Sequence, residues 1–353
     1  MLGTVVGALL LLGLLTTGWS AALRDLAMAL AAQSFFVALI LYVVMVALLS
    51  EVVQLPLAFY QGVTLERRYG LSTQTSARWW LDRLKAGGIA LLFALAGALI
   101  VMSLLRWSPD DWWLIAAACF ACILVLLAQL APVMLLPLFY EFKPLNRPNL
   151  TGRLAALAER AGVRVLGVFE WRLSDRTRKA NAALTGMGRT RRILLSDTLL
   201  ADHGDEEIEV ILAHELAHHV HRDIWKSIAL EIVLIALGFY LADRALSAAA
   251  GRFGIASKDD IAGLPLLVLA AGTVSLALLP LANAFSRAHE RRADRYALDM
   301  TKNAGAFVSA MKRLAVQNLA EERPTRLVEL LFYSHPPMAA RIDAAQAWAK
   351  EHG

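Results

Sequence analysis

Residues 205–218 read DEEIEVILAHELAH, and this stretch predicts a helix that carries a metal-binding face. The acidic run at 205–207 suits the first turn of a helix, because the helix dipole favours negative charge there. His214 and His218 stand one turn apart, so both imidazoles can bind one tetrahedral zinc ion while Glu215 lies beside it. For these residues alone, the alternative is a polar helix with two solvated histidines.

Long uncharged apolar segments make up much of the rest of the chain. Hydrophobic residues account for 58% of the 353 residues and charged residues for 18%, whereas soluble domains average about 45–50% and 25%. Five segments have the roughly 20 residues that cross a hydrocarbon core, and a sixth is shorter. In chain order the six are Met1–Leu23, Leu26–Ser50, Ala86–Leu105, Trp112–Tyr140, Ser227–Ala242 and Ile261–Ser286. The sequence therefore predicts a membrane protein with about six crossings.

The first segment has no Lys or Arg ahead of its apolar stretch, which favours a membrane helix over a cleaved signal peptide. Six crossings place the Glu66–Lys85 loop, residues 141–223 and the tail after Ser286 on one side of the membrane. Near the membrane ends, that side carries fourteen Lys and Arg residues against five on the other side. The positive-inside rule predicts that this side is cytoplasmic.

Charge and cysteine usage exclude other classes. The net charge of +5 comes without a basic stripe interleaved with aromatic residues, so nucleic acid is not an expected partner. Cys119 and Cys122 lie on an apolar segment, and two cysteines at that spacing imply no disulfide framework. Arg outnumbers Lys by 27 to 8, which together with abundant Ala is typical of a GC-rich prokaryotic coding sequence. In a prokaryote the membrane would be the inner or cell membrane.

The composition changes at Glu141, where a polar region follows the fourth apolar segment. We therefore expect one region at residues 1–140 with four membrane helices. The second, at residues 141–353, holds the metal site and two further membrane helices, at about 224–243 and 261–286.

The polar part of the second region predicts helices and a small mixed sheet packed against the helix of the metal site. Gly186 and Gly188 suit a hairpin-like turn between two strands, and the His214 helix is expected to continue through residues 222–223 towards the membrane. Helical spacing covers Leu150–Gly162, Phe285–Met300, Ala306–Ala320 and Ala339–Ala349, and β-prone runs cover Val163–Trp171 and Arg191–Ser196.

A catalytic zinc needs three protein ligands and one open position, so a third ligand must come from elsewhere in the chain. Glu290 is the best candidate, because Asp294 follows one helical turn later and can orient a ligating histidine. His289 competes for this place, but on a helix it points about 100° away from Glu290 and has no carboxylate one turn on. The alternative for the whole helix is a surface lattice of ion pairs with Arg287, Arg291 and Arg295.

Further blocks in the same order extend the pattern from about residue 51 to residue 342. They are Leu55-Pro56, Glu66–Leu71, Asn181-Ala182 with Thr185-Gly186, Arg192–Leu195, Asp197–Leu200, Ser286-Arg287, and Ser334–Pro337 with Arg341. With the two metal-site motifs, these blocks resemble the zinc-dependent, membrane-spanning CaaX prenyl proteases of the a-factor-converting, gluzincin-like type. The resemblance implies one Zn²⁺ per chain, bound by His214, His218 and Glu290.

The resemblance also implies roles for other residues. Glu215 would be the general base, and Asp294 would orient a zinc ligand from the second shell of contacts. His335 and Arg341 would lie near the reaction centre and hold the substrate backbone or the oxyanion. Asn181 would belong to the edge strand along which the family lays its peptide.

The expected fold is mainly α: a polytopic membrane protein with about six transmembrane helices and a zincin-like α+β catalytic domain that carries a small sheet. The expected function is a zinc metalloendopeptidase that cleaves prenylated, CaaX-type proteins or other membrane-associated proteins. Its partners would be a peptide or protein substrate, lipidated or not, and membrane lipid. Eukaryotic members have an extra N-terminal crossing and an acidic insertion, whereas here Leu200 lies fourteen residues before His214, which predicts a smaller or more open intramembrane chamber.

Two alternative functions remain at this point. The chain also resembles, more distantly, the HtpX-type quality-control proteases of membranes, which share the zinc motifs. A membrane scaffold or transporter with a structural zinc is the alternative from another class. Structural zinc sites usually have four protein ligands, and three are evident here.

Overall fold

A computed structural model describes residues 2–186, 191–321 and 323–352. The chain forms two compact units, each assembled from separate segments. Unit 1 contains Met1–Arg68, Thr75–Leu124 and Glu231–Ala277, and unit 2 contains Tyr69–Gln74, Val125–Leu230 and Leu278–Gly353.

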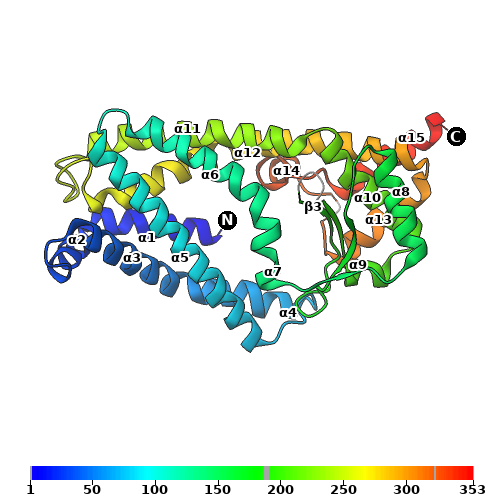
Figure 1. Ribbon diagram of the computed structural model, residues 1–353, viewed down its shortest axis with the longest axis horizontal. Helices are drawn as coiled ribbons and strands as arrows, with labels where there is room; N and C mark the ends of the chain where they lie inside the picture. The colour runs from blue at the N-terminus through cyan, green and yellow to red at the C-terminus, as the bar shows by residue number, and fades with distance from the viewer. Residues whose placement is uncertain (1, 187–190, 322, 353) are drawn as a thin grey trace. The chain divides into compact units, whose positions relative to one another are not determined.

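Unit 1 is built from helices (Figure 1). They are α1 (Leu2–Thr16), α2 (Trp19–Leu30), α3 (Phe35–Phe59), the π-helix η1 (Tyr60–Leu65), α4 (Glu66–Arg68), α5 (Ser76–Trp107), the 3₁₀ turn η3 (Ile261–Gly263), and parts of α6 (Trp112–Met134), α11 (Asp223–Ala249) and α12 (Leu264–Thr301). Within the described residues, five stretches are long and apolar enough to cross a membrane: Phe35–Arg68, Ser76–Trp107, Trp112–Phe139, Asp223–Ala249 and Ile261–Thr301. The predicted polytopic architecture is confirmed.

The first two expected crossings have different boundaries from those predicted. The chain bends by 75° between α1 and α2, where Gly18 adopts a φ of 77° and the Thr17 hydroxyl donates back to the Gly13 carbonyl. A second break follows α2, where Ala32 and Gln33 both have positive φ. A hydropathy profile does not reveal such breaks, because the residues at them have small or uncharged side chains. The bent pair can count as a sixth span beside the other five.

A buried polar cluster lies inside the helices of unit 1. The Asp243 side chain is fully buried and accepts a hydrogen bond from the Trp112 indole at 2.8 Å. The Lys258 ammonium lies 2.7 Å from the same carboxylate, and the Arg244 guanidinium pairs with its other oxygen. The buried charge is therefore compensated on both oxygens, as a buried carboxylate requires.

Unit 2 contains a four-stranded mixed sheet with the order β1-β2-β4-β3. The strands β2 and β4 are parallel, and the β1–β2 and β3–β4 pairs are antiparallel. The strands are β1 (Phe142–Pro144), β2 (Gly167–Trp171), β3 (Ala182–Thr185) and β4 (Arg192–Ser196). The expected small mixed sheet is confirmed, with β3 at one edge. Gly188 of the predicted turn lies outside the described residues.

Unit 2 also contains helices. They are α7 (Leu136–Phe139), α8 (Pro148–Arg160), α9 (Asp197–Asp202), α10 (Asp205–Val220), α13 (Ala304–Gln317), α14 (Arg326–Phe332) and α15 (Met338–His352). α10 contacts α8, α13 and β3, and Ile208, Leu212 and Leu216 on it are completely buried. Its start is closed by the Glu207 carboxylate, which accepts from the Gly204 amide at 2.8 Å. The helix that carries the two histidines is thus fixed in the core of unit 2.

The expectation that α10 continues through residues 222–223 is wrong. α10 ends at Val220, and Arg222 adopts a left-handed φ of 56°, which stops the helical hydrogen-bond ladder. α11 begins immediately afterwards at Asp223. This turn redirects the chain directly after the metal-binding face.

The segment between α4 and α5 belongs to unit 2. Thr73 donates its amide to the Arg176 carbonyl at 3.1 Å, Arg178 donates to the Leu71 carbonyl at 2.9 Å, and Ser72 forms a β-bridge with Thr177. This pairing joins the segment to residues 176–178 of unit 2.

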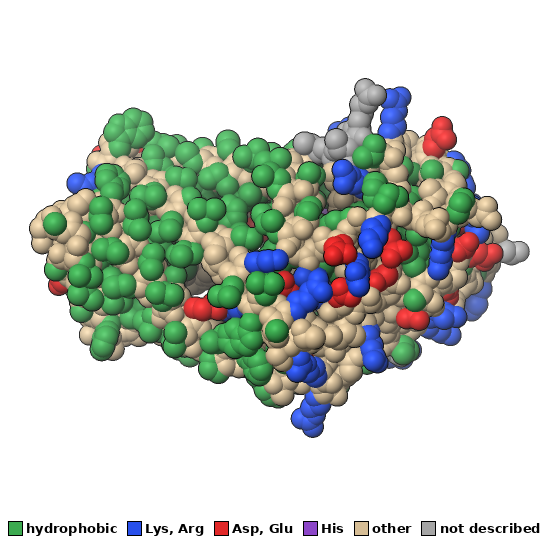
Figure 2. Space-filling model, turned by 60° about the horizontal axis from the view of Figure 1, so that its bottom comes forward, with side chains coloured by type: hydrophobic (Ala, Val, Ile, Leu, Met, Phe, Trp, Pro, Cys, Tyr) green, Lys and Arg blue, Asp and Glu red, His purple; other side chains and the backbone are tan. Residues whose placement is uncertain are grey.

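Figure 2 shows how the side chains differ between the two units. Hydrophobic side chains are spread over the visible face of unit 1 with few charged ones among them, whereas Lys, Arg, Asp and Glu gather over unit 2. Lipid is the environment that the surface of unit 1 fits.

We predict that Asp243→Ala destabilises the protein by roughly 3–5 kcal/mol, because it leaves the Trp112 indole and the Lys258 ammonium without their buried partner. Denaturant unfolding of the protein in mild detergent measures this loss. Asp259→Ala is the matched control, since Asp259 pairs with Arg106 at 3.8 Å on the surface and should cost under about 1 kcal/mol. Equal losses in the two variants would contradict the prediction.

Candidate metal centre

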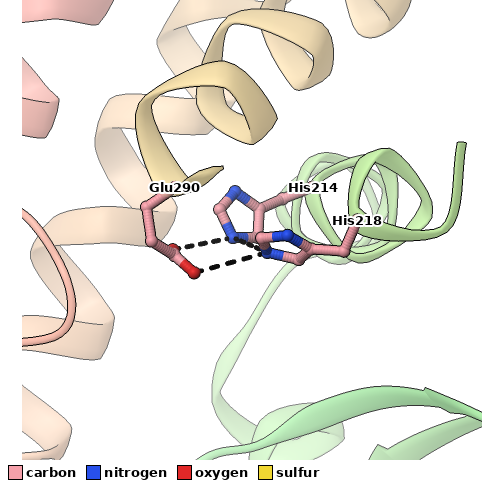
Figure 3. Close-up of side chains that lie close together, drawn as sticks. All are labelled: His214, His218 and Glu290. Carbon is pink, nitrogen blue, oxygen red and sulfur yellow. Dashed lines mark hydrogen bonds and ion pairs between the residues drawn. The ribbon is translucent and has the colours of Figure 1, made fainter. Parts of the chain in front are cut away.

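Three side chains from two helices converge on one point in unit 2 (Figure 3). His214 and His218 extend from the same face of α10, and Glu290 extends towards them from α12. The two Nε2 atoms lie 3.3 Å apart. Glu290 Oε2 lies 3.2 Å from His214 Nε2, and Glu290 Oε1 lies 3.4 Å from His218 Nε2.

These distances fit a tetrahedral metal ion. Ligand bonds of about 2.0–2.1 Å place neighbouring ligand atoms about 3.3 Å apart at the corners of a tetrahedron. The buried Glu290 Oε2 lies 3.2 Å from His214 Nε2 and has no other polar partner within the described part of the chain, so a cation between the two atoms would complete its coordination. Two imidazoles and one carboxylate suit zinc, and three protein ligands leave one position open for water or substrate.

A second carboxylate orients the first histidine. Asp294, one turn after Glu290 on α12, lies with its Oδ1 2.9 Å from His214 Nδ1. Arg341 on α15 donates to both Asp294 oxygens, at 2.8 and 2.6 Å. Both side chains are buried. This arrangement directs His214 Nε2 towards Glu290.

Charge at the site favours a cation. Burial alone would lower the pKa of His214, but its hydrogen bonds with Asp294 and Glu290 outweigh burial and raise the pKa to about 9. Burial also opposes the charge on His218, and Glu290 again raises its pKa. A metal that binds here must therefore displace protons from the imidazoles.

Glu215 follows the first histidine on α10 and takes no part in the trio of Figure 3. Its side chain is half-buried. Burial raises the pKa of Glu215, and this effect exceeds the opposite influence of His214 and His218. The carboxylate is therefore a stronger base than a solvated glutamate, as a group that accepts a proton from water requires.

His335 reaches the site from the segment between α14 and α15. Its Nε2 lies 3.4 Å from Glu290 Oε1, and its side chain is 61% exposed, so its position depends on the anchoring of this segment. Arg287 donates to the carbonyls of Glu329 and Tyr333 at 3.0 and 2.6 Å. These bonds from α12 hold the chain just before His335.

The remaining candidates lie around this centre. Asn181 directly precedes β3, and its backbone N–H donates a hydrogen bond to the Ser196 hydroxyl at 2.9 Å. Its side chain is exposed. His289 is buried 3.9 Å from Asp223 and is not a member of the ligand trio. Arg295 pairs with Asp299 instead of Glu290.

Sequence reasoning missed Asp223. Its Oδ2 lies 3.1 Å from His218 Nδ1, the ring nitrogen that faces away from the trio. The available signal was a carboxylate five residues after His218. On a continuous helix that residue would point away from His218, and only the left-handed turn at Arg222 brings it back.

Two family profiles cover almost the whole chain. Residues 1–141 match the CAAX prenyl protease N-terminal region, described as five membrane helices, and residues 144–349 match peptidase family M48. An uncharacterized metalloprotease, YhfN, of Bacillus subtilis is 32% identical over 309 residues, which are 86% of this chain and 72% of that protein. CAAX prenyl protease 1 of Saccharomyces cerevisiae is 28% identical over 322 residues, which are 84% of this chain and 69% of that protein.

The crystal structure of S. mikatae Ste24p has a similar fold, with a TM-score of 0.83 at 24% sequence identity. The match covers 94% of this chain and 81% of that one. The M48 match alone spans more than half of the chain. The chain is therefore a membrane metalloprotease that belongs to peptidase family M48, with the N-terminal membrane region of the CAAX prenyl proteases.

Proposed function

We propose that this protein binds one zinc ion through His214, His218 and Glu290 and hydrolyses peptide bonds in prenylated, CaaX-type proteins or other membrane-associated proteins. The observation that carries the proposal is that His214 Nε2, His218 Nε2 and the Glu290 carboxylate lie 3.2 to 3.4 Å from one another, with no fourth metal-ligating side chain in the group among the described residues. A structural zinc would need a fourth protein ligand, so a scaffold or transporter is the weaker explanation.

The zinc, when bound, would polarise a water molecule and the scissile carbonyl as a Lewis acid. Glu215 would accept a proton from that water and pass it to the leaving amine, in the order of general base and then general acid. The exposed His335 side chain would donate a hydrogen bond to the carbonyl oxygen as it gains charge. Arg341, whose guanidinium is occupied by Asp294, would act near the reaction centre by holding that carboxylate against His214.

β3 would bind the substrate in an extended conformation. It pairs with β4 on one side, and its other edge meets no strand within the described residues. Main-chain hydrogen bonds along such an edge bind a peptide with little demand on its sequence. Asn181, at the start of this edge, would contact the peptide beyond the strand.

Substitutions of the two glutamates should separate metal binding from catalysis. Glu215→Gln should keep one zinc per chain but reduce kcat by a factor of at least about 10². Glu290→Ala should lose most of the zinc as well, because it removes one of three ligands. Elemental analysis and peptide turnover measure the two effects. Full activity in purified Glu215→Gln protein would rule out the mechanism.

His335→Ala provides the control for these variants. Its zinc content should stay at the wild-type level, since it lies outside the ligand trio, while kcat falls by roughly 10²–10³ through loss of one oxyanion donor. An unchanged kcat would remove His335 from the proposed mechanism.

Lipid dependence separates the two substrate classes. If CaaX-type proteins are the substrates, kcat/KM should be at least about tenfold higher for a farnesylated peptide than for the same peptide without the lipid, since burying apolar carbons stabilises binding. Glu215→Gln protein is the blank for both peptides. Equal rates would instead favour a quality-control protease that accepts other membrane-associated proteins.

We further propose that unit 2 faces the cytoplasm, because the positive-inside rule assigns the side with more Lys and Arg to it. A cysteine introduced at exposed Lys350, in a variant with Cys119 and Cys122 replaced by Ala, should react with a membrane-impermeant maleimide only after cells are opened. Labelling in intact cells would reverse the orientation.

A further inference from the structure

Asp223 occupies the junction between the metal-binding helix and the next helix. It is the first residue of α11 and follows the left-handed Arg222. Its side chain is only 5% exposed, although it carries a carboxylate. A buried carboxylate is costly unless it has specific partners, so its contacts indicate what it does.

The two carboxylate oxygens of Asp223 face different partners. Oδ2 lies 3.1 Å from His218 Nδ1. Oδ1 pairs with the Arg292 guanidinium of α12 and lies 3.4 Å from the Lys226 ammonium. His289 Nε2 lies 3.9 Å from the same oxygen. Oδ2 therefore contacts the histidine of the metal site, and the charge on Oδ1 is neutralised by neighbouring cations.

The Oδ2 contact fixes which ring nitrogen of His218 is free. A carboxylate at Nδ1 accepts the N–H of the neutral imidazole and so leaves the lone pair on Nε2. That Nε2 faces Glu290 Oε1 at 3.4 Å and His214 Nε2 at 3.3 Å. The negative charge behind the ring also raises its basicity as a ligand.

The Oδ1 contact connects two helices that supply ligands. Arg292 lies two residues after Glu290 on α12, and its guanidinium reaches the carboxylate that holds His218 of α10. The same pattern occurs at the other histidine, where Asp294 contacts His214 and Arg341 neutralises Asp294. Each ligating imidazole thus has a buried carboxylate next to its Nδ1, and each of these carboxylates forms an ion pair with an arginine.

We propose that Asp223 is a positioning residue that sets the affinity of the site for its metal by fixing the tautomer and direction of His218. The proposal rests on the zinc site proposed above. Outer carboxylates of this kind typically change metal affinity 10- to 100-fold in other proteins. Asp223 acts through His218 and touches neither the metal position nor the peptide.

The test measures the zinc dissociation constant of the full-length protein in detergent, by competition with a chelator of known affinity at one pH. Asp223→Ala should weaken zinc binding about 10- to 100-fold. Asp223→Asn should lie between this variant and the wild type, since its amide oxygen can accept the Nδ1 proton without the charge. Zinc release should become faster in the same order.

Lys226→Ala is the matched control, because Lys226 contacts only the Oδ1 side of Asp223. It should bind zinc as the wild type does. Thermal unfolding of the zinc-free proteins shows whether Asp223→Ala still folds, and if it does not, the nearly isosteric Asp223→Asn decides the matter. Unchanged zinc affinity in Asp223→Asn and in a folded Asp223→Ala overturns the proposal, as does an equal loss in Lys226→Ala.

The same measurement distinguishes this proposal from the proposed function. A wild-type protein that binds no zinc overturns both the zinc site and the role of Asp223. A wild-type protein that binds one zinc, with unchanged affinity in the Asp223 variants, overturns only the role of Asp223.

Discussion

The candidate metal site depends on the approach of a carboxylate on α12 to two imidazoles on α10. Neither helix holds three ligands by itself, so the site exists only where the two helices lie within about one ligand-to-ligand distance of each other. Burial of Ile208, Leu212 and Leu216 fixes α10 in the core. Asp294 and Asp223 then fix the orientation of the two imidazole rings. The negative charge of each carboxylate is balanced by an arginine, Arg341 for Asp294 and Arg292 for Asp223.

Glu215, the proposed general base, and the two histidines, the proposed ligands, obtain different properties from the same few turns of helix. The ligating imidazoles meet carboxylates, which raise their proton affinity and therefore suit them to a cation. Glu215 is raised in pKa by burial, so it acts as a base stronger than usual. One helix thus carries both the proposed metal ligands and the proposed proton acceptor, because the surroundings of these side chains differ from one residue to the next.

Much of this site could be predicted from the sequence, because helical spacing alone puts His214 beside His218 and Glu290 beside Asp294. The apolar segments likewise predicted the membrane helices. The turn at Arg222 and the bend at Gly18 could not be predicted in this way, since one residue with positive φ barely alters hydropathy or periodicity. Asp223 was missed for the same reason. The pairing of Ser72 with Thr177 depends on folding of distant segments and has no local signal.

If the substrate pairs with β3 as proposed, the edge of β3 that meets no strand within the described residues would determine which shapes of polypeptide reach the metal. The strand is four residues long, and a partner that pairs with it must give up its own helical or sheet hydrogen bonds over roughly 13 Å of extended chain. A folded domain keeps those backbone groups occupied and cannot pair, whereas a loose tail or an unfolded segment can. Under that proposal the edge would select for unfolded chain segments, so the enzyme would spare folded neighbours in a crowded membrane without recognising their sequence.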